Sequence, residues 1–130
     1  MELPEFAPGL GARVELTVTD ADTAQSLGSG DVPVLGTPRL LALAEAATVA
    51  ATARQMPGGV TTVGTRAEVE HRLPTPVGGR VEAFATLTKV DGRKLIFEVI
   101  VKTGDAVVAD VRVERMLLDR QRFIAKALGD

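Results

Sequence analysis

Two side chains on one stretch of the chain and a single histidine carry groups that could attack or activate an electrophile. Thr37 begins the stretch TPRLLALAEAATVAATARQM, and Glu45 is the only carboxylate within it. His71 is the only imidazole of the chain. A threonine hydroxyl is a nucleophile once a base takes its proton, and a carboxylate or an imidazole can be that base. Thr37, Glu45 and His71 are therefore the candidate catalytic residues.

Glu45 also has a simpler interpretation, as part of the solvent face of an ordinary amphipathic helix. At about 100° per residue it shares one narrow stripe with three polar residues, Thr48, Thr52 and Gln55. A buried role is equally compatible with the sequence, because residues 40–53 are otherwise apolar or small and most of their surface must be covered.

The other polar candidates have structural alternatives too. Alternation along residues 106–118 places Arg115 on the inward face of a strand, where a cation needs a partner. Arg115 can therefore form a structural ion pair, with Glu45 as one possible partner. His71 can be a histidine satisfied in the core or at a strand end, and Thr37 can act only as a helix N-cap.

The element that must position these groups is a helix over residues 37–56. Thr37 is a good N-cap, Pro38 suits the first helical position, and residues 56–59, MPGG, end the helix. Thr37 and Glu45 are eight residues apart, so they differ by ~12 Å along the helix axis. The gap between them fits a bound electrophile, and the positive helix end can stabilise an oxyanion there.

Five segments have strand character. Residues 12–19 alternate, residues 80–90 and 94–103 flank the hairpin signal Asp91-Gly92, and Gly104-Asp105 leads into residues 106–118. Residues 60–71 form the remaining strand, and simple alternation places His71 on the face that also carries Val63, Thr65, Ala67 and Val69.

The remaining segments frame these elements. Residues 1–11 predict an extended, weakly held arm, and residues 20–36 predict a long loop of the kind that often forms a lid or binding loop. Asp119 should cap a short final helix whose apolar residues dock on the body: Phe123, Ile124 and Leu128.

The order of elements predicts a single α+β domain over residues 1–130, with an antiparallel sheet wrapped around one long helix. One helix cannot shield a whole sheet, and an alanine-rich helix allows close cover by another surface, so we expect a dimer.

Composition excludes several classes of function. The net charge of -2 and the absence of Trp and Tyr argue against nucleic-acid binding. The absence of cysteine and the single histidine argue against a metal site of thiolate or multi-histidine type. We expect no metal, no membrane span and no signal peptide, and therefore a cytoplasmic protein.

Segments carrying these residues resemble the fluoroacetyl-CoA thioesterase-like family of hotdog-fold thioesterases. The resemblance extends from about residue 34 to residue 126, through VLGTPRLLALAEAA, TTVGTRAEVEHRLPTPVG, VDGRKLIFEV and LLDRQRFIAKAL. It implies catalytic roles for Thr37, Glu45 and His71, and substrate-binding roles for Gly64 and Arg115. It also implies a hotdog-fold homodimer that holds acyl-CoA along the subunit interface, with no cofactor besides the coenzyme A of the substrate.

The expected activity is hydrolysis of an acyl-CoA thioester to coenzyme A and a carboxylic acid. Either Thr37 attacks with His71 as base, or Glu45 activates water while Thr37 and the Gly64 amide position the carbonyl. The segment GSGDVPVLG lacks the phenylalanines of the fluoroacetyl-specific enzyme, which argues against fluoroacetyl specificity and leaves the acyl group open. The alternatives are a non-catalytic module that binds acyl-CoA or acyl carrier and, less favoured, a hotdog hydratase. A hydratase pairs an acidic residue with a histidine five positions away, where this chain has Arg66.

Overall fold

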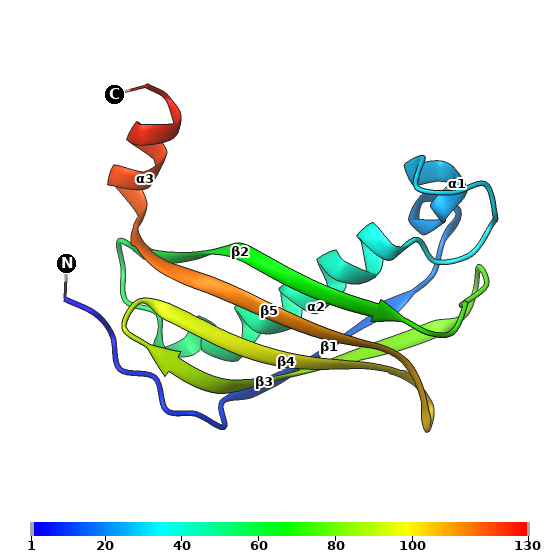
Figure 1. Ribbon diagram of the computed structural model, residues 1–130, viewed down its shortest axis with the longest axis horizontal. Coiled ribbons are helices and arrows are strands. Elements are labelled where there is room, and N and C mark those ends of the chain that lie inside the picture. Colours follow the sequence, from blue (N-terminus) through cyan, green and yellow to red (C-terminus); the bar gives the residue numbers. More distant parts are fainter. Residues whose placement is uncertain (1, 130) are drawn as a thin grey trace.

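The computed structural model, which describes residues 2–129, contains one antiparallel sheet and one long helix that crosses it (Figure 1). The strand order is β1-β3-β4-β5-β2, so β1 and β2 form the two edges. The strands are β1 (Gly11–Thr17), β2 (Val60–His71), β3 (Arg80–Asp91), β4 (Lys94–Thr103) and β5 (Ala106–Asp119). The helices are α1 (Ala24–Leu27), α2 (Thr37–Thr52) and α3 (Arg120–Ala127), with short 3₁₀ turns η1 (Asp20–Asp22) and η2 (Ala53–Gln55). The predicted α+β architecture is confirmed, and Met1 and Asp130 lie outside the described residues.

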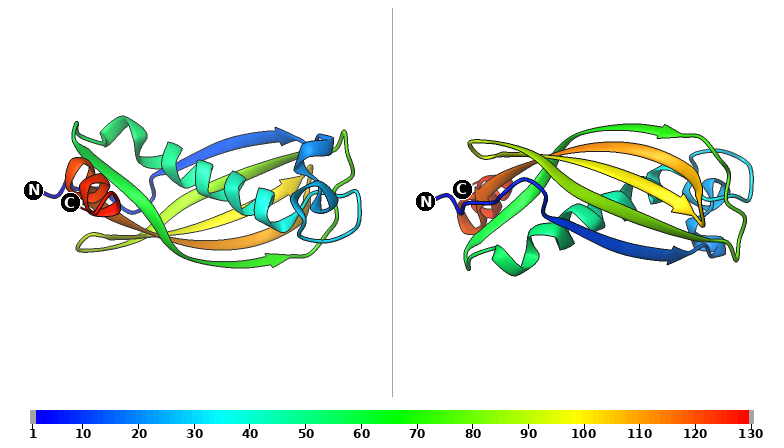
Figure 2. Two further views of the ribbon diagram at one scale, coloured as in Figure 1. Left: turned by 90° about the horizontal axis from the view of Figure 1, so that it is seen from above. Right: turned by 90° about the horizontal axis from the view of Figure 1, so that it is seen from below.

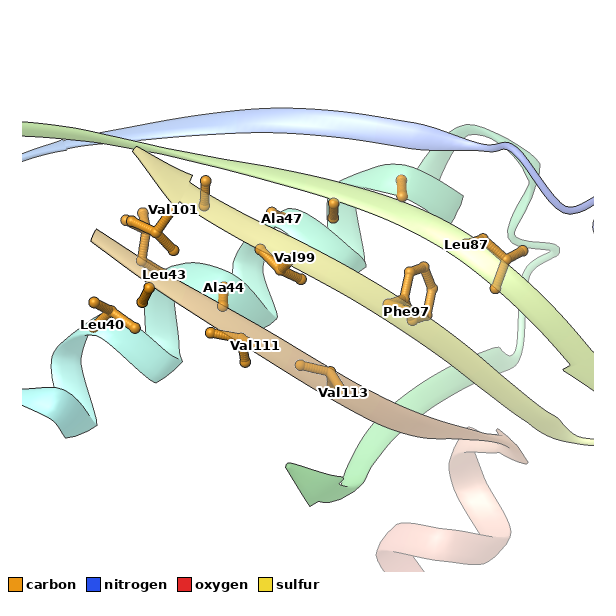
Figure 3. Packing of buried hydrophobic residues seen from close by; sticks show 14 of the residues in the cluster. Leu40, Leu43, Ala44, Ala47, Leu87, Phe97, Val99, Val101, Val111 and Val113 are labelled. Carbon is orange, nitrogen blue, oxygen red and sulfur yellow. The ribbon is translucent and has the colours of Figure 1, made fainter. Parts of the chain in front are cut away.

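The core lies between α2 and the inner face of the sheet. Helix α2 runs lengthwise across that face (Figure 2). Its small residues Ala44 and Ala47 are fully buried beside Leu40, which lets the helix axis approach the strands closely. The sheet contributes Phe97, Val99, Val101, Val111 and Val113 to the same cluster (Figure 3).

The buried face of α2 differs from the stripe that a solvent-facing Glu45 would require. Thr48 and Thr52 are both buried, and the Thr48 hydroxyl donates to the backbone oxygen of Glu45 at 2.6 Å. The exposed side of the helix carries small and apolar residues instead: Ala42, Ala46, Val49 and Ala50. The interpretation of the polar stripe as a solvent face is therefore wrong, and an apolar helix face is left open.

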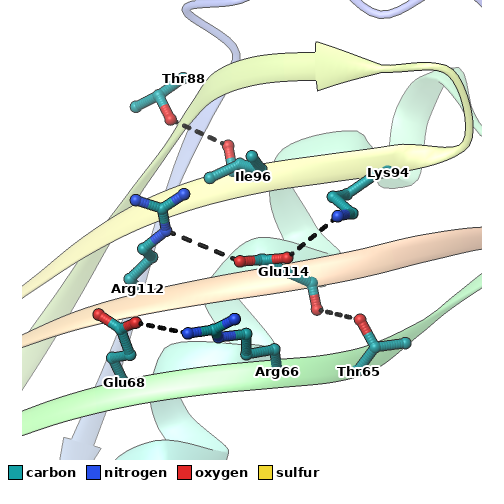
Figure 4. Close-up of polar contacts among 8 residues, drawn as sticks. All are labelled: Thr65, Arg66, Glu68, Thr88, Lys94, Ile96, Arg112 and Glu114. Carbon is teal, nitrogen blue, oxygen red and sulfur yellow. Dashed lines mark hydrogen bonds and ion pairs between the residues drawn. The ribbon is translucent and has the colours of Figure 1, made fainter.

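A β-bulge in β2 changes which of its residues face inward. Gly64 is opposite Arg115 on β5 while Arg66 is opposite Glu114, so Thr65 is an extra residue without a partner across the ladder. The Thr65 hydroxyl instead donates to the Glu114 carbonyl at 3.3 Å (Figure 4). The prediction that Val63 and Thr65 share the face of His71 is wrong, because alternation changes phase at the bulge and Gly64 faces inward instead.

The outer face of the sheet carries charged side chains on β2, β4 and β5 beside an exposed apolar pair, Phe84 and Ile100. Glu114 lies 3.6 Å from Lys94 and 3.9 Å from Arg112, and Arg66 lies 3.3 Å from Glu68 (Figure 4). Only the Lys94–Glu114 pair joins two strands, and charged side chains on this face need no second covering layer. The two predicted hairpins are present, with Gly92 and Gly104 at φ of 59° and 57° in their turns.

Three peripheral segments differ from their predicted form. The loop 20–36 contains η1 and α1, and its end is fixed by a bridge between Thr23 and Leu35. The N-terminal arm is anchored rather than weakly held, because Phe6 is buried in the core and Gly9 donates to the Leu87 carbonyl at 2.8 Å.

Helix α3 does not dock on the body. Asp119 caps it as predicted, accepting from the Arg122 amide at 3.0 Å. However, the helix stands away from the sheet (Figure 1), and its apolar residues Phe123, Ile124 and Leu128 are all exposed.

Candidate active site

Thr37 and His71 form a direct pair at the open end of the helix. Thr37 is the first residue of α2, and His71 is the last residue of β2, on the inward face opposite the buried Ala109. The Thr37 Oγ1 and the His71 Nδ1 are 2.7 Å apart. Thr37 is exposed while His71 is half-buried, so the hydroxyl is accessible and the ring behind it is shielded. This is the contact that a hydroxyl nucleophile needs with its base.

The hydroxyl of Thr37 is free for this contact because it does not cap the helix. The N-cap is Gly36, and no side chain caps this end, so the predicted capping role of Thr37 is wrong. The backbone N–H groups of Arg39 and Leu40 both donate to the Gly36 carbonyl, at 3.1 and 3.0 Å. These two amides are therefore engaged within the first turn and do not supply the free oxyanion donors that the sequence predicted.

Asp22 fixes the start of α2 from outside the helix. Its Oδ1 accepts from Arg39 Nε at 3.0 Å, and its backbone carbonyl accepts from the Gly36 amide at 2.9 Å. Hydrogen bonds from the Thr19 amide and hydroxyl, together with Arg39, lower the pKa of Asp22 below 3.8 despite its burial. A charged and nearly buried aspartate thus holds the first turn, and with it Thr37, in place.

The environment of His71 favours the neutral ring. Burial lowers its pKa from 6.5, and the backbone of Leu73 opposes this shift. Within residues 2–129 the buried Nε2 has no hydrogen-bond partner that satisfies normal geometry. A neutral imidazole whose Nδ1 accepts the Thr37 proton is the form required of a general base at neutral pH.

Glu45 and Arg115 form a second polar pair, further along α2. Arg115 Nη1 is 3.4 Å from Glu45 Oε2, and the guanidinium also donates to the hydroxyl and carbonyl oxygens of Thr62, at 3.0 and 3.1 Å. Burial lowers the pKa of Arg115 and Glu45 opposes this shift, and the group stays protonated. Arg115 is thus a buried cation with three acceptors, and it holds the partly exposed Glu45 carboxylate at one position.

Gly64 is the residue that lets the Glu45 carboxylate reach the sheet. A Cβ at this position would lie 2.5 Å from Glu45 Oε2 and 3.5 Å from Arg115 Nη1. Any side chain would therefore displace the carboxylate from its position over β2. The glycine is therefore needed for the close approach of the Glu45 carboxylate to β2.

The structure brings the five predicted residues together in two groups, not in one. Thr37 and His71 form the first group; Glu45, Gly64 and Arg115 form the second. Gly64 and His71 are seven residues apart on β2, which corresponds to roughly 20 Å along a strand. Within one chain the nucleophile and its base therefore lie apart from the carboxylate.

Cavities lie next to both groups. One of about 340 Å³ lies beside Thr37 and His71 and is lined by apolar residues of the preceding loop, including Val32 and Val34, and by Leu73. Another of about 230 Å³ lies between the end of α2 and the start of β2, where Thr62 belongs to its wall. Among residues 2–129, no cluster of three or more His, Cys, Asp or Glu side chains could hold a metal ion.

Comparison with known proteins agrees with this fold. The family described as fluoroacetyl-CoA-specific thioesterase, FlK, matches residues 18–121. A phenylalanine-to-alanine mutant of the fluoroacetyl-CoA-specific thioesterase FlK is 27% identical, with a TM-score of 0.88 over 96% of this chain and 97% of that one. A threonine-to-serine FlK mutant in complex with acetyl-CoA is 25% identical, with a TM-score of 0.90 over 95% and 98%. A thioesterase superfamily member from Thermus thermophilus, 22% identical, shares the fold at a TM-score of 0.87 over 95% and 91%. None of the curated protein sequences compared with the chain matches it.

The sheet wrapped on its helix and the similarity to FlK identify a hotdog-fold thioester hydrolase. Within that class, the chain belongs to the fluoroacetyl-CoA-specific thioesterase family. Among residues 2–129, no helix is long and apolar enough to cross a membrane.

Sequence reasoning did not identify the residues that support the site. Asp22 and Arg39 fix Thr37, and Thr62 fixes Arg115. Asp22 lies in a segment rich in Gly, Ser and Asp, where one carboxylate among several gives no signal. Strict alternation counted back from His71 places Thr62 on the outer face, and only the bulge turns it inward.

Proposed function

We propose that the chain is an acyl-CoA thioesterase in which the Thr37 hydroxyl attacks the thioester carbonyl and His71 accepts its proton. The observation that carries this proposal is the 2.7 Å contact between Thr37 Oγ1 and His71 Nδ1. In the first step a carbon–oxygen bond to Thr37 forms, the carbon–sulfur bond breaks, and the proton passes from His71 to the departing thiolate of coenzyme A. Water then attacks the resulting ester and releases the carboxylic acid.

We assign to Glu45 the role of activating the water in the second step. When it accepts one proton from the attacking water, the hydroxide adds to the acyl carbon, and the proton returns to the Thr37 oxygen as the ester bond breaks. Arg115 and Gly64 act on the position of this carboxylate, one by holding it and the other by leaving room for it. The net reaction consumes one thioester and one water and needs no added cofactor.

Because Glu45 lies far from Thr37 in its own chain, we propose a homodimer in which each site combines two subunits. Strand β2 is an edge, and its residues 64–68 are all exposed, including Ala67, whose partner in the ladder, Val113, is buried. An edge strand can pair with its own copy around a two-fold axis. The open apolar face of α2 gives a partner a surface to cover beside that strand.

The charges of β2 favour one register for this pairing. A two-fold axis at Ala67 places Arg66 opposite Glu68 of the partner subunit, twice, which is a favourable cross-strand pair. The bulged Thr65 has no partner across a ladder, so the count of residue pairs between the two β2 strands skips it. His71 of the partner subunit then lies opposite Thr62, which is the inward-facing residue next to Gly64. Thr37 and His71 of one subunit would thus meet Glu45 of the other.

The acyl group is assigned to the cavity beside Thr37 and His71. Its walls include Val32, Val34 and Leu73 and no phenylalanine, and its volume is about 340 Å³. FlK structures have been determined with acetyl-CoA and with fluoroacetate bound to mutants. An aliphatic lining of this size favours acyl chains longer than fluoroacetyl in the present chain.

The test is thiol release from a panel of straight, branched and aromatic acyl-CoA thioesters by the purified protein. The wild type should release thiol, and Thr37→Ala, Glu45→Gln and His71→Ala should each lower kcat at least ~100-fold with an unchanged circular dichroism spectrum. A wild-type protein that binds acyl-CoA tightly without releasing thiol would support the non-catalytic module instead. Wild-type turnover in Thr37→Ala would refute the nucleophile.

A further inference from the structure

A further cavity lies away from both polar groups, beside α3, the helix that does not dock on the body. It has a volume of about 530 Å³ and lies between α3, the end of β5 and the turn that joins β3 to β4. Helix α3 stands away from the sheet at this end of the molecule (Figure 1). The lining residues are Arg93, Leu118, Asp119, Arg122, Phe123 and Lys126.

The wall of this cavity is cationic. Helix α3, RQRFIAKA, has three cations and no acidic residue, in a chain whose net charge is -2. Within residues 2–129, none of Arg93, Arg122 and Lys126 enters an ion pair. The one carboxylate in the wall, Asp119, already accepts the Arg122 amide as the helix cap. Three cations without protein partners converge on one cavity, which suits a ligand with several negative charges.

One aromatic ring faces the same space. Phe123 is 40% exposed, in a chain that has four Phe and neither Trp nor Tyr. A half-exposed phenylalanine beside cations offers one flat face for a heterocyclic base and positive charges for phosphates. This combination fits a phosphorylated nucleoside better than it fits an inorganic anion.

The cavity also lies at a suitable distance from the Glu45 group. Leu118 follows Arg115 by three residues on β5, ~10 Å along the strand and on the opposite face, so an extended pantetheine arm reaches from one to the other past the end of the strand. The cavity of about 230 Å³ whose wall includes Thr62 also includes Arg120, the first residue of α3. It occupies the region between the carboxylate group and the cationic cavity.

We infer that the cavity beside α3 binds the phosphorylated adenosine end of coenzyme A, with Arg93, Arg122 and Lys126 facing the phosphates and Phe123 facing the adenine. This inference rests on the proposed function and adds a nucleotide subsite to it. It also accounts for a helix that carries exposed apolar residues without covering the core.

The test compares coenzyme A with pantetheine, which lacks the nucleotide, by titration calorimetry on the wild type and on two charge-matched double variants. Arg122→Ala/Lys126→Ala removes cations from the cavity. Arg80→Ala/Lys102→Ala removes the same charge at the opposite end of the sheet. We expect the wild type to bind coenzyme A at least ~10-fold more tightly than pantetheine, and only the first variant to lose this difference.

Steady-state kinetics separates this subsite from the proposed reaction. Arg122→Ala/Lys126→Ala should raise KM for acyl-CoA about 10-fold or more, leave kcat unchanged, and leave kcat/KM for the acyl-pantetheine thioester unchanged. Equal wild-type affinity for coenzyme A and pantetheine would overturn the subsite, as would equal losses in the two double variants. Failure of the wild type to hydrolyse either thioester refutes the proposed function, while the calorimetric comparison still tests the subsite.

A second copy of the chain is the competing occupant of this surface, and Phe123→Ala distinguishes it. Loss of coenzyme A affinity with an unchanged sedimentation coefficient supports the nucleotide subsite. A changed oligomeric state with unchanged coenzyme A affinity would overturn it.

Discussion

Mixing two inactive variants should restore activity if each site takes its groups from two subunits. The variants are Thr37→Ala and Glu45→Gln, each expected at ~1% of wild-type turnover or less. In a mixed dimer, the Glu45 of the first chain meets the intact Thr37 and His71 of the second, so one of the two sites is complete. The other site carries both substitutions and is inactive.

The size of the recovery follows from counting sites. A purified mixed dimer should have about half of wild-type activity, because one site in two is intact. Random reassortment of equal amounts makes about half of the dimers mixed, so the mixture should reach about one quarter of wild type. Relative to either variant alone, this is a rise of about 25-fold or more.

The assay is thiol release by co-expressed subunits that carry different affinity tags and are purified through both tags. The matched control pairs Thr37→Ala with His71→Ala, which lie 2.7 Å apart in one chain and belong to the same half of the site. Every site in that mixed dimer lacks one of the two groups, so no activity should return. Background activity in both mixed dimers would show that the site forms within one chain and would refute the composite site.

Three further predictions follow from individual contacts. Gly64→Ala should lower kcat about 10-fold or more through displacement of the Glu45 carboxylate, with little change in Tm because position 64 is exposed; unchanged kcat would contradict the role of close approach. The acid limb of the kcat/KM profile should have its midpoint below 6.5, because burial lowers the pKa of His71 and protonation removes the base; a midpoint above 6.5 would contradict this role. Asp22→Asn should destabilise the protein by about 1–2 kcal/mol at pH 7 in urea unfolding. Since the pKa of Asp22 is lowered in the folded protein, the difference in free energy of unfolding between wild type and Asp22→Asn should shrink as pH falls below 3.8 through the pKa of the folded state. A difference that does not change with pH would show that the shape of the side chain, and not its charge, causes the destabilisation.

Most of the fold follows from local patterns that the structure confirms. Alternation located five strands, and the pairs Asp91-Gly92 and Gly104-Asp105 located both hairpin turns. The inward position of Arg115 also follows from alternation, because β5 keeps a regular pattern from residue 109 to residue 117. These features depend on residues close together in the chain, which is why they can be predicted from the sequence.

The features that could not be predicted depend on long-range contacts. Thr37 looks like an N-cap from its neighbours, but its hydroxyl lies against a histidine 34 positions away. The bulge at Thr65 depends on how β2 pairs with β5, and no residue type in TTVGTRAEV predicts it. The apolar residues of α3 predict docking, but the helix stands away from the sheet and these residues are exposed.

The exposed apolar face of α2 also depends on long-range contacts. From the sequence, Thr48 and Thr52 could form a wet stripe, but the curvature of the sheet buries them and leaves alanines exposed. Small residues fit a closely approached surface on either side of a helix, so composition alone does not identify the side that the chain covers itself. The position of the strands decides which side of α2 is buried.

The extra residue in β2 gives the protein a phase shift that can be removed without altering any reactive side chain. Deletion of Thr65 would leave Gly64 and His71 six residues apart, so strict alternation would keep both on the inner face and each would keep its partner on β5. With Thr65 retained and forced into the ladder, one half of the strand would have to turn its inward residues to solvent, or the ladder with β5 would have to slip by one position. The bulge is thus what lets two residues seven positions apart face the same side, and deletion of Thr65 should leave both of them facing inward.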